Sequence, residues 1–286
     1  MKIQKILGPV TALDFFDRQW ILAAILNCSF GELRLKSQEE VPTQEARAFS
    51  TAWKKRKQGW PLQYCVSQSS FWGRNFFVNK NVLIPRPETE VLVEQALRIG
   101  DELEKKAGRP IRLIDVGTGS GIIAITLKLE RPHWEVMASD ISAPALQVAK
   151  NNAKTLKTRI TFHRQSLLDF RELVPAIDLV ISNPPYVDFR KDFVAADVKK
   201  FEPKNALEPA LEFKLPELKE RAAWLAERLL RSAQEKKISA VLMELSPRIA
   251  YGLQRSWRKK RLVSYTERIP DLAGRKRFLL VGFKNG

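Results

Sequence analysis

From Ile111 to Leu245, short apolar runs typical of β-strands alternate with longer stretches whose apolar residues recur at helical spacing. Such alternation predicts a mostly parallel sheet with helices on both faces, because parallel strands need long crossover connections. The expected strands are Ile111–Val116, Trp134–Ser139, Arg159–Arg164, Ile177–Ser182 and Ile238–Leu245. The expected helices between them span residues 122–129, 143–156 and 217–234.

Two further strands are expected near the end of the sequence, at Leu262–Arg268 and Arg277–Phe283. The connection between them is short enough for antiparallel pairing at one edge of the sheet. We therefore predict an α/β, Rossmann-like fold with a seven-stranded, mostly parallel sheet and an antiparallel edge hairpin.

The residues before Ile111 show a different pattern. Apolar residues from Leu13 to Asn27 fall at helical spacing, and Thr43–Lys57 and Glu88–Lys106 predict two further helices. The β-formers on either side of Asn79-Lys80-Asn81 predict a hairpin within Phe71–Pro87. The expected division is a helical domain over residues 1–69, a β-hairpin linker over 70–87 and the α/β domain over 88–286.

Composition excludes several other classes of protein. The 286 residues are 44% apolar, which argues against disorder, and no apolar run is long enough to cross a membrane. The apolar stretch Trp20–Phe30 is about half that length, so we expect a core helix there. Cys28, Cys65 and the two histidines have no metal-ligand spacing and make no disulfide framework. A cytoplasmic protein without a metal site is expected.

The net charge of +17 is unusually high, and much of it lies near the end of the sequence. Residues 251–286 contain ten basic and two acidic residues, with clusters at Trp257–Arg261 and Arg275–Arg277, and Lys54–Lys57 is a separate cluster. A basic surface of this kind attracts polyanions such as nucleic acid or an acidic protein. The alternative is a solvated, lysine-rich surface. If the basic segment guides a substrate, neutralising Arg258–Arg261 should weaken substrate binding.

A glycine-rich loop, "DVGTGSG" (Asp115–Gly121), follows the first strand of the α/β region and precedes a helix. Glycines there let the backbone turn sharply and approach a ligand closely. Ile122 stands where a dinucleotide-binding fingerprint needs its third glycine, so the spacing favours a cofactor without a pyrophosphate, such as S-adenosylmethionine. Asp140, at the end of the next strand, is placed to bind the ribose hydroxyls. The alternative is a tight turn without a ligand.

The stretch "NPPY" (Asn183–Tyr186) ends the fourth strand of the predicted sheet. In open α/β sheets, ligands bind outside the carboxyl ends of the strands, so this turn and the glycine loop should face one crevice. The Asn183 side-chain oxygen and the Pro184 carbonyl can accept the two hydrogens of an –NH2 group, and the Tyr186 ring can stack on a planar group. This arrangement predicts methylation of an amide or an exocyclic amine by positioning and electrostatics. A merely rigid turn is the alternative, and the motif does not choose between glutamine and adenine.

The segment before the α/β region favours one of these two methyl acceptors. "GWPLQYCVSQSSFWGRNFFVNKNVLIPRPETE" (Gly59–Glu90) closely resembles the protein N5-glutamine methyltransferases of the HemK type, which modify peptide chain release factors. The resemblance continues through "DVGTGSG", "NPPYV", "FEP" (Phe201–Pro203) and "DLAGRKR" (Asp271–Arg277). It covers nearly everything after residue 59, whereas the N-terminal helices match only in type.

The resemblance implies a class I S-adenosylmethionine-dependent methyltransferase that methylates N5 of the glutamine in the Gly-Gly-Gln loop of release factors and yields S-adenosylhomocysteine. The implied catalytic residues are Asn183, Pro184 and Tyr186. The implied cofactor-binding residues are Asp115, Gly117, Thr118, Gly119, Ser120, Gly121, Asp140, Ile141, Leu168 and Asn183. The implied substrate-binding residues are Asn183, Pro184, Pro185, Tyr186, Arg86 and Glu88. We expect a monomer whose partners are release factors, without stable nucleic-acid binding or membrane attachment.

The sequence departs from the family pattern in the expected adenine pocket. Leu167 stands where an acidic residue is usual, which would remove a hydrogen bond to the adenine amino group. Two alternatives therefore stay open. One is an amino-adenine methyltransferase acting on DNA or RNA, which shares "NPPY" and would use the basic surface. The other is a binding protein that kept the fold and lost catalysis.

Overall fold

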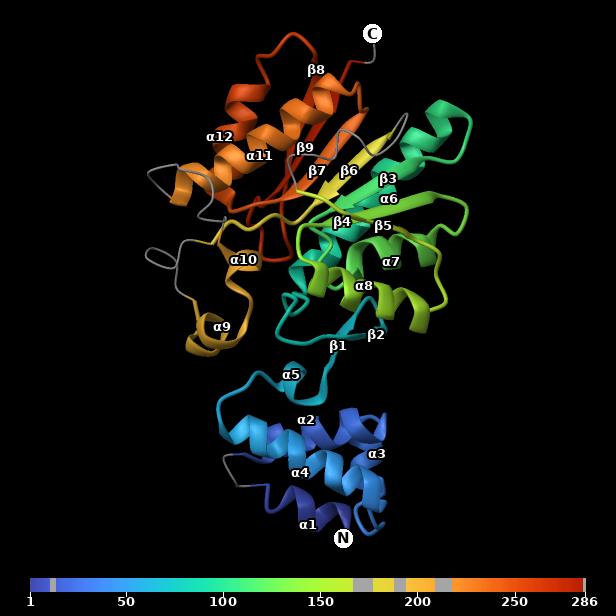
Figure 1. Ribbon diagram of the computed structural model, residues 1–286, viewed down its shortest axis with the longest axis vertical. Coiled ribbons are helices and arrows are strands. Elements are labelled where there is room, and N and C mark those ends of the chain that lie inside the picture. The colour runs from blue at the N-terminus through green and yellow to red at the C-terminus, as the bar shows by residue number, and fades with distance from the viewer. Residues whose placement is uncertain (11–13, 167–176, 188–193, 209–217, 285–286) are drawn as a thin grey trace.

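The computed structural model describes residues 1–10, 14–166, 177–187, 194–208 and 218–284, without the side chains of 218–220. Its N-terminal part contains five helices, and the chain then forms a two-stranded hairpin and a seven-stranded sheet (Figure 1). The N-terminal helices lie at one end of the molecule, and the hairpin lies between them and the sheet (Figure 1). No helix among the described residues is long and apolar enough to cross a membrane.

The N-terminal helices pack around their own core. Ile21, Leu22 and Leu33 are completely buried there. Ser29 begins the third helix with a capping box, in which its hydroxyl accepts from the Glu32 N–H while the Glu32 carboxylate accepts from the Ser29 N–H. The five helices are α1 (Ile3–Leu7), α2 (Phe15–Leu26), α3 (Phe30–Leu35), α4 (Thr43–Lys57) and α5 (Leu62–Val66). The helix predicted at Thr43–Lys57 is confirmed, and the apolar stretch from Trp20 forms α2 as far as Leu26.

The linking hairpin pairs β1 (Gln68–Phe71) with β2 (Arg74–Phe77), so the hairpin predicted around Asn79–Asn81 is wrong. Its turn is Trp72-Gly73, where both residues have positive φ, as the right-handed twist of a two-residue hairpin requires. The asparagines after β2 make a different turn, in which the Asn79 side-chain oxygen accepts from the Asn81 N–H. The β-formers thus do make a hairpin, but its turn lies at Trp72-Gly73 and not at the asparagines.

The large sheet has the strand order β5-β4-β3-β6-β7-β9-β8, with β3 to β7 parallel and β9 antiparallel to both of its neighbours. The seven predicted strands and the antiparallel edge pair are thus confirmed. The strands are β3 (Arg112–Val116), β4 (Glu135–Asp140), β5 (Thr161–Arg164), β6 (Leu179–Ser182), β7 (Ala240–Glu244), β8 (Val263–Ile269) and β9 (Phe278–Phe283).

Helices cover both faces of this sheet. Successive residues of a strand point to opposite faces, so buried neighbours on one strand belong to two different cores. On β3, Leu113 packs in the core beneath α6 (Glu88–Ala107) and α7 (Ile122–Glu130). Ile114 packs in the core beneath α11 (Leu218–Glu235) and α12 (Pro247–Trp257). The helices of this part are α6 (Glu88–Ala107), α7 (Ile122–Glu130), α8 (Ala143–Thr155), α9 (Ala196–Phe201), α10 (Lys204–Leu207), α11 (Leu218–Glu235) and α12 (Pro247–Trp257). Helices α9, α10 and α12 were not predicted.

The topology defines where a ligand can bind. From β3 the chain continues to β4 and β5 on one side, and then returns to β6 and β7 on the other. The loops after the neighbouring strands β3 and β6 therefore diverge and leave a crevice at their carboxyl ends. These two loops are the glycine-rich loop and the NPPY turn, as predicted from their positions in the sequence.

The basic segment Arg258–Arg261 lies at the amino ends of the strands, opposite the crevice. It joins α12 to β8, and β8 runs in the same direction as β7, so the segment precedes the amino end of its strand. Exposed Lys236 and Lys237 lie at the same end of the strands, just before β7. The segment therefore lies away from the crevice, and the prediction that its neutralisation weakens substrate binding stays a prediction.

Candidate active site

One side of the crevice is the glycine wall, which we define as residues 117–121 and 140–142. Gly117, Gly119 and Gly121 have φ of +78°, +55° and +82°, a region that side chains disfavour. The N–H groups of Gly117 and Thr118 both donate to the Ser139 carbonyl, at 2.8 and 2.9 Å, and this fixes the loop against β4. The glycines are therefore required by the course of the backbone.

Gly121 is also required by packing. A Cβ at this position would lie 2.9 Å from Ile125 Cδ1 and 3.1 Å from the Ala149 Cβ, because α7 begins here against α8. A Cβ contact of 2.9 Å essentially never occurs and one of 3.1 Å is unusually tight, so the Ile125 side chain would have to move. Gly121 thus supports the wall from behind and is not among the residues lining the cavity.

Asp115 lies completely buried beneath the loop. Its Oδ2 accepts a hydrogen bond of 2.6 Å from the Thr118 hydroxyl. Burial raises the pKa of this carboxyl to about 7, and the Thr118 hydrogen bond only partly opposes that shift. Asp115 does not line the cavity, so the structure gives it a supporting position.

Asp140 ends β4 and faces the cavity. Its Oδ2 accepts from the Gly119 N–H and its Oδ1 from the Ser142 N–H, both at 2.9 Å. These bonds fix the carboxylate and leave each oxygen with a further lone pair for a ligand. Burial raises the pKa of Asp140 despite these backbone hydrogen bonds.

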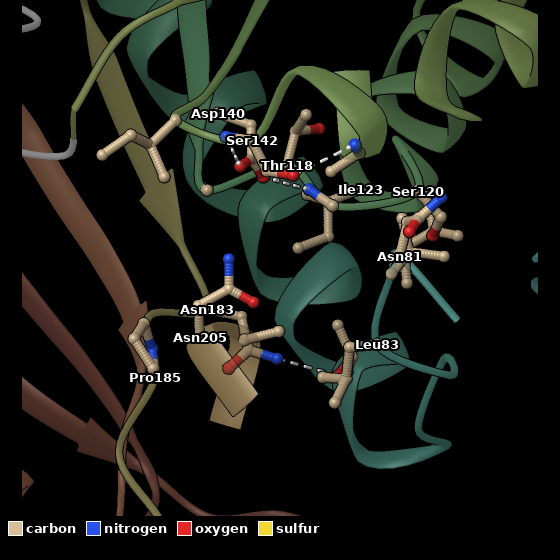
Figure 2. Close-up of a pocket in the computed structure, with 18 of the residues that line it drawn as sticks. Asn81, Leu83, Thr118, Ser120, Ile123, Asp140, Ser142, Asn183, Pro185 and Asn205 are labelled. Atoms are coloured by element: carbon tan, nitrogen blue, oxygen red, sulfur yellow. Dashed lines mark hydrogen bonds between the residues drawn. The ribbon is translucent and has the colours of Figure 1, made fainter. Parts of the chain in front are cut away.

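The cavity in front of this wall has a volume of about 310 Å³. Figure 2 shows Asp140, Ser142 and Thr118 on one side, with Asn183, Pro185 and Asn205 across from them. The predicted site residues that line it are Gly117, Thr118, Gly119, Ser120, Asp140, Ile141, Asn183, Pro185 and Arg86. Asp115, Gly121, Pro184, Tyr186 and Glu88 do not line it, and Leu168 lies outside the described residues, as does Leu167.

Sequence reasoning missed several lining residues, including Asn81, Leu83, Thr89, Ile123, Ser142 and Asn205. Ser142 could have been found, because its side chain caps α8 directly after the predicted ribose-binding aspartate. Thr89 lies inside the "IPRPETE" run but was not singled out. Nothing in the local sequence distinguishes Asn205, which reaches the cavity from α10.

The other side of the crevice is the amide wall, which we define as Thr89, Asn183–Tyr186 and Glu244. Asn183 Nδ2 donates to Thr89 Oγ1 at 3.4 Å, and Thr89 Oγ1 donates to Glu244 Oε2 at 3.0 Å. The Tyr186 hydroxyl donates to Glu244 Oε1 at 2.9 Å. One buried carboxylate on β7 therefore connects the first and the last residue of the NPPY turn.

Glu244 is almost completely enclosed, and burial raises its pKa, although hydrogen bonds from Tyr186 and Thr89 and the charge of Arg277 oppose that shift. Burial also raises the pKa of Tyr186, so its hydroxyl stays protonated. Arg277 forms an ion pair with Asp271 at 2.8 Å, so the "DLAGRKR" segment contributes the cation beside this network.

Arg86 and Glu88, the other predicted substrate residues, differ in position. Arg86 lines the cavity, and its guanidinium pairs with the buried Glu202 carboxylate at 2.6 Å. Glu202 also accepts from the Ile84 N–H at 3.1 Å, so the "FEP" segment is joined to the segment that precedes α6. Glu88 is the first residue of α6 and does not line the cavity.

The N-terminal helices contact this same region. The Phe201 ring packs against Trp60 with 4.6 Å between the centroids. The buried Tyr64 of α5 donates to the Val82 carbonyl at 2.5 Å. Val82, which lines the cavity, and Phe201 of α9 are therefore both connected to the helical part of the chain.

Comparisons with known proteins agree with this arrangement. Residues 12–66 match the family described as the PrmC N-terminal domain, and residues 98–209 match the methyltransferase small domain. The solved hMettl16 catalytic domain, in complex with an RNA hairpin, is similar with a TM-score of 0.54 and 15% identity, covering 85% of this chain and 82% of that one. A second structure, the "delta-N METTL16 MTase domain", has a TM-score of 0.51 at 16% identity and covers 84% and 96%. At these identities the likeness shows the fold alone, and it confirms the class I methyltransferase fold.

Curated relatives are more similar in sequence. The release factor glutamine methyltransferase of Enterococcus faecalis is 42% identical over 174 residues, which are 60% of each chain, so the match spans less than two thirds of that relative. The enzyme of the same name from Neisseria gonorrhoeae is 40% identical over 201 residues, which are 69% of this chain and 70% of that protein. With this identity over more than two thirds of the Neisseria protein, the chain belongs to the family of release factor glutamine methyltransferases.

Proposed function

We propose that this protein transfers a methyl group from S-adenosylmethionine to N5 of the glutamine in the Gly-Gly-Gln loop of peptide chain release factors. The relatives that carry this name support the proposal. The structural observation that carries it is the position of Asn183 in the same cavity as the glycine loop and Asp140.

The glycine wall fits the cofactor. The backbone at Gly119 is open, since a Cβ there would meet nothing within 4 Å, so a ligand can approach it closely. The Asp140 carboxylate, fixed by two N–H groups, keeps lone pairs for the two hydroxyls of a ribose. When bound, S-adenosylmethionine supplies an electrophilic methyl group on a sulfonium.

The amide wall fits the methyl acceptor. The Asn183 donor group already faces Thr89, so its oxygen is available to accept one hydrogen of the glutamine –NH2. The Pro184 carbonyl would accept the other, and the two successive prolines limit the motion of the turn. Two acceptors on one amide nitrogen orient its lone pair and increase its electron density, which is how positioning and electrostatics accelerate a displacement. No side chain has to remove the proton before the methyl group is transferred.

The test is a transfer assay with labelled S-adenosylmethionine. The protein is incubated with a release factor, with its Gln-to-Ala loop variant, or with DNA and RNA. Label on the release factor that disappears with the loop variant supports the proposal. Label on nucleic acid alone would establish the amino-adenine reaction instead, and cofactor binding without any label would establish the binding protein. A cytoplasmic monomer that meets release factors transiently is part of the same proposal.

A further inference from the structure

An asparagine side chain has two ends of nearly equal size and opposite polarity. The proposed reaction needs the oxygen of Asn183 toward the substrate nitrogen, because an –NH2 group there would face the –NH2 of the glutamine. Because the two ends are nearly equal in size, shape alone separates the two orientations poorly. The polarity must therefore come from the groups that Asn183 contacts on its other side.

The contact of Asn183 is the Thr89 hydroxyl, which has one proton to donate. Glu244 Oε2 lies 3.0 Å from the same oxygen, and an ionised carboxylate only accepts. The Thr89 proton is thus used toward Glu244, and its oxygen can only accept from Asn183. This contact favours Nδ2 toward Thr89 and leaves Oδ1 for the substrate.

The second half of the network fixes Glu244 in turn. The cation of Arg277 lies close enough to the Tyr186 hydroxyl to oppose the rise in its pKa, and a hydroxyl directs its oxygen, not its proton, toward a cation. The Tyr186 proton therefore points to Glu244 Oε1, at 2.9 Å. Every proton in the series from Tyr186 to Asn183 has a defined direction.

We propose that Thr89 and Glu244 are positioning residues that set the polarity of the Asn183 amide, so that its oxygen faces the nitrogen to be methylated. The inference rests on the proposed function for the identity of that nitrogen. It assigns a role to the threonine of the "IPRPETE" run and to a buried carboxylate that touches neither cofactor nor substrate in our proposal.

Two near-isosteric substitutions test the direction of the protons. In Thr89→Val the acceptor for Nδ2 is lost, so both amide orientations become accessible. In Glu244→Gln the Tyr186 proton still requires an acceptor, so the glutamine oxygen faces Tyr186 and its –NH2 faces Thr89. The Thr89 proton then turns toward Asn183, and the amide is expected to rotate by half a turn. Glu244→Gln should therefore reverse the polarity, whereas Thr89→Ser should preserve it.

The first measurement does not depend on activity. In the 15N-labelled full-length protein, the Asn183 side-chain –NH2 signals are identified by their absence in Asn183→Ala. We expect these signals to shift in Thr89→Val and in Glu244→Gln, and to stay near their original position in Thr89→Ser. Unchanged signals in both of the first two variants would overturn the proposal. Because no substrate is present, this result is independent of whether the proposed function is correct.

The second measurement is transfer to the release factor. Losing a hydrogen bond that orients a reacting group should lower kcat about 10-fold or more in Thr89→Val and Glu244→Gln. The affinity for S-adenosylhomocysteine and the melting temperature should change little, and Thr89→Ser should restore most of kcat. A fall in cofactor affinity that fully accounts for the lost activity would overturn the positioning role.

The matched control is Thr126→Val. Thr126 is also completely buried, lies on α7 outside the cavity lining, and its hydroxyl has no hydrogen-bond partner among the described residues. We expect unchanged kcat and unchanged Asn183 signals in this variant. If Thr126→Val reproduced the effects of Thr89→Val, those effects would come from buried threonine packing and the proposal would fail.

Discussion

The two sides of the cavity are built in different ways. The glycine wall is made by backbone geometry within two short segments, 117–121 and 140–142, which neighbouring strands bring together. The amide wall is made by side chains from α6, the NPPY turn and β7, assisted by Arg277 just before β9. The glycine wall depends on glycines, which have no side chain. The amide wall depends on the direction in which the protons of its side chains point. Substitutions in the two walls should therefore have different effects on stability, cofactor binding and transfer.

The largest effect is expected for Asn183→Ala in the amide wall. Removing the acceptor that holds the substrate nitrogen should lower transfer by a factor of about 100 to 1,000 or more, as for other preorganised polar groups. The fold should stay intact, because Asn183 lies at the cavity surface. Turnover and circular dichroism check the two statements, and retained turnover would remove Asn183 from the reaction.

Gly121→Ala should damage the glycine wall through the fold itself. Its φ of +82° and the short contacts of the new Cβ with Ile125 and Ala149 should cost about 1–3 kcal/mol of unfolding free energy. Urea denaturation measures that loss, and calorimetry should show weaker cofactor binding. Gly119→Ala is the comparison variant, because its added Cβ meets nothing within 4 Å and only the φ of +55° is unfavourable. An equal loss of stability in both variants would contradict the packing argument.

The pH dependence of kcat should report on the amide wall, and the pH dependence of cofactor affinity should report on the glycine wall. Burial raises the pKa of both Glu244 and Asp140, so each becomes protonated at a higher pH than an ordinary carboxyl as the pH falls. Protonated Glu244 can donate to Thr89 and reverse the amide polarity, so kcat should decline on the acidic side. The groups facing Glu244 are Thr89, the neutral Tyr186, the cation of Arg277, which opposes protonation, and Glu88, which favours it.

Cofactor affinity should decline separately, through Asp140. The diagnostic variant is Glu244→Gln, which should lose the acidic decline of kcat and keep that of cofactor affinity. Parallel profiles of kcat and cofactor affinity in this variant would show that the two walls titrate as one unit.

The smallest effect is expected outside both walls. Changing Arg258, Lys259 and Arg261 together to glutamine should leave KM for the release factor within about 3-fold. These exposed charges lie at the amino ends of the strands, away from the crevice, and salt screens them. Retention on a polyanionic column should fall clearly. A salt-dependent rise in KM would instead support the sequence-based prediction that neutralising this segment weakens substrate binding.

Local sequence was enough for the glycine wall and for most elements of the sheet. The glycine spacing and Asp140 at the next strand end act over a few residues, so their pattern carries the geometry. The hairpin turn was misplaced because Asn79–Asn81 and Trp72-Gly73 both have turn chemistry, and the strand pairing decides between them.

The amide wall could be predicted only in part. Asn183 and Tyr186 stand in a recognisable motif, but their partner Glu244 lies on another strand, inside an apolar run that predicts only a buried strand. Thr89 likewise looks like an ordinary residue in the first turn of a helix. Hydrogen bonds between segments far apart in the sequence leave no local pattern, so this network required the structure.

The position of β9 between β7 and β8 has a consequence for synthesis on the ribosome. A nascent chain that has emerged as far as Ser142 already contains every residue of the glycine wall. The cation beside Tyr186 is made far later, with Arg277, and β8 has no partner in the sheet until β9 follows. Chains interrupted in the interval from Ser142 to Arg277 therefore contain every residue of the glycine wall but lack the cation that lies beside the amide wall.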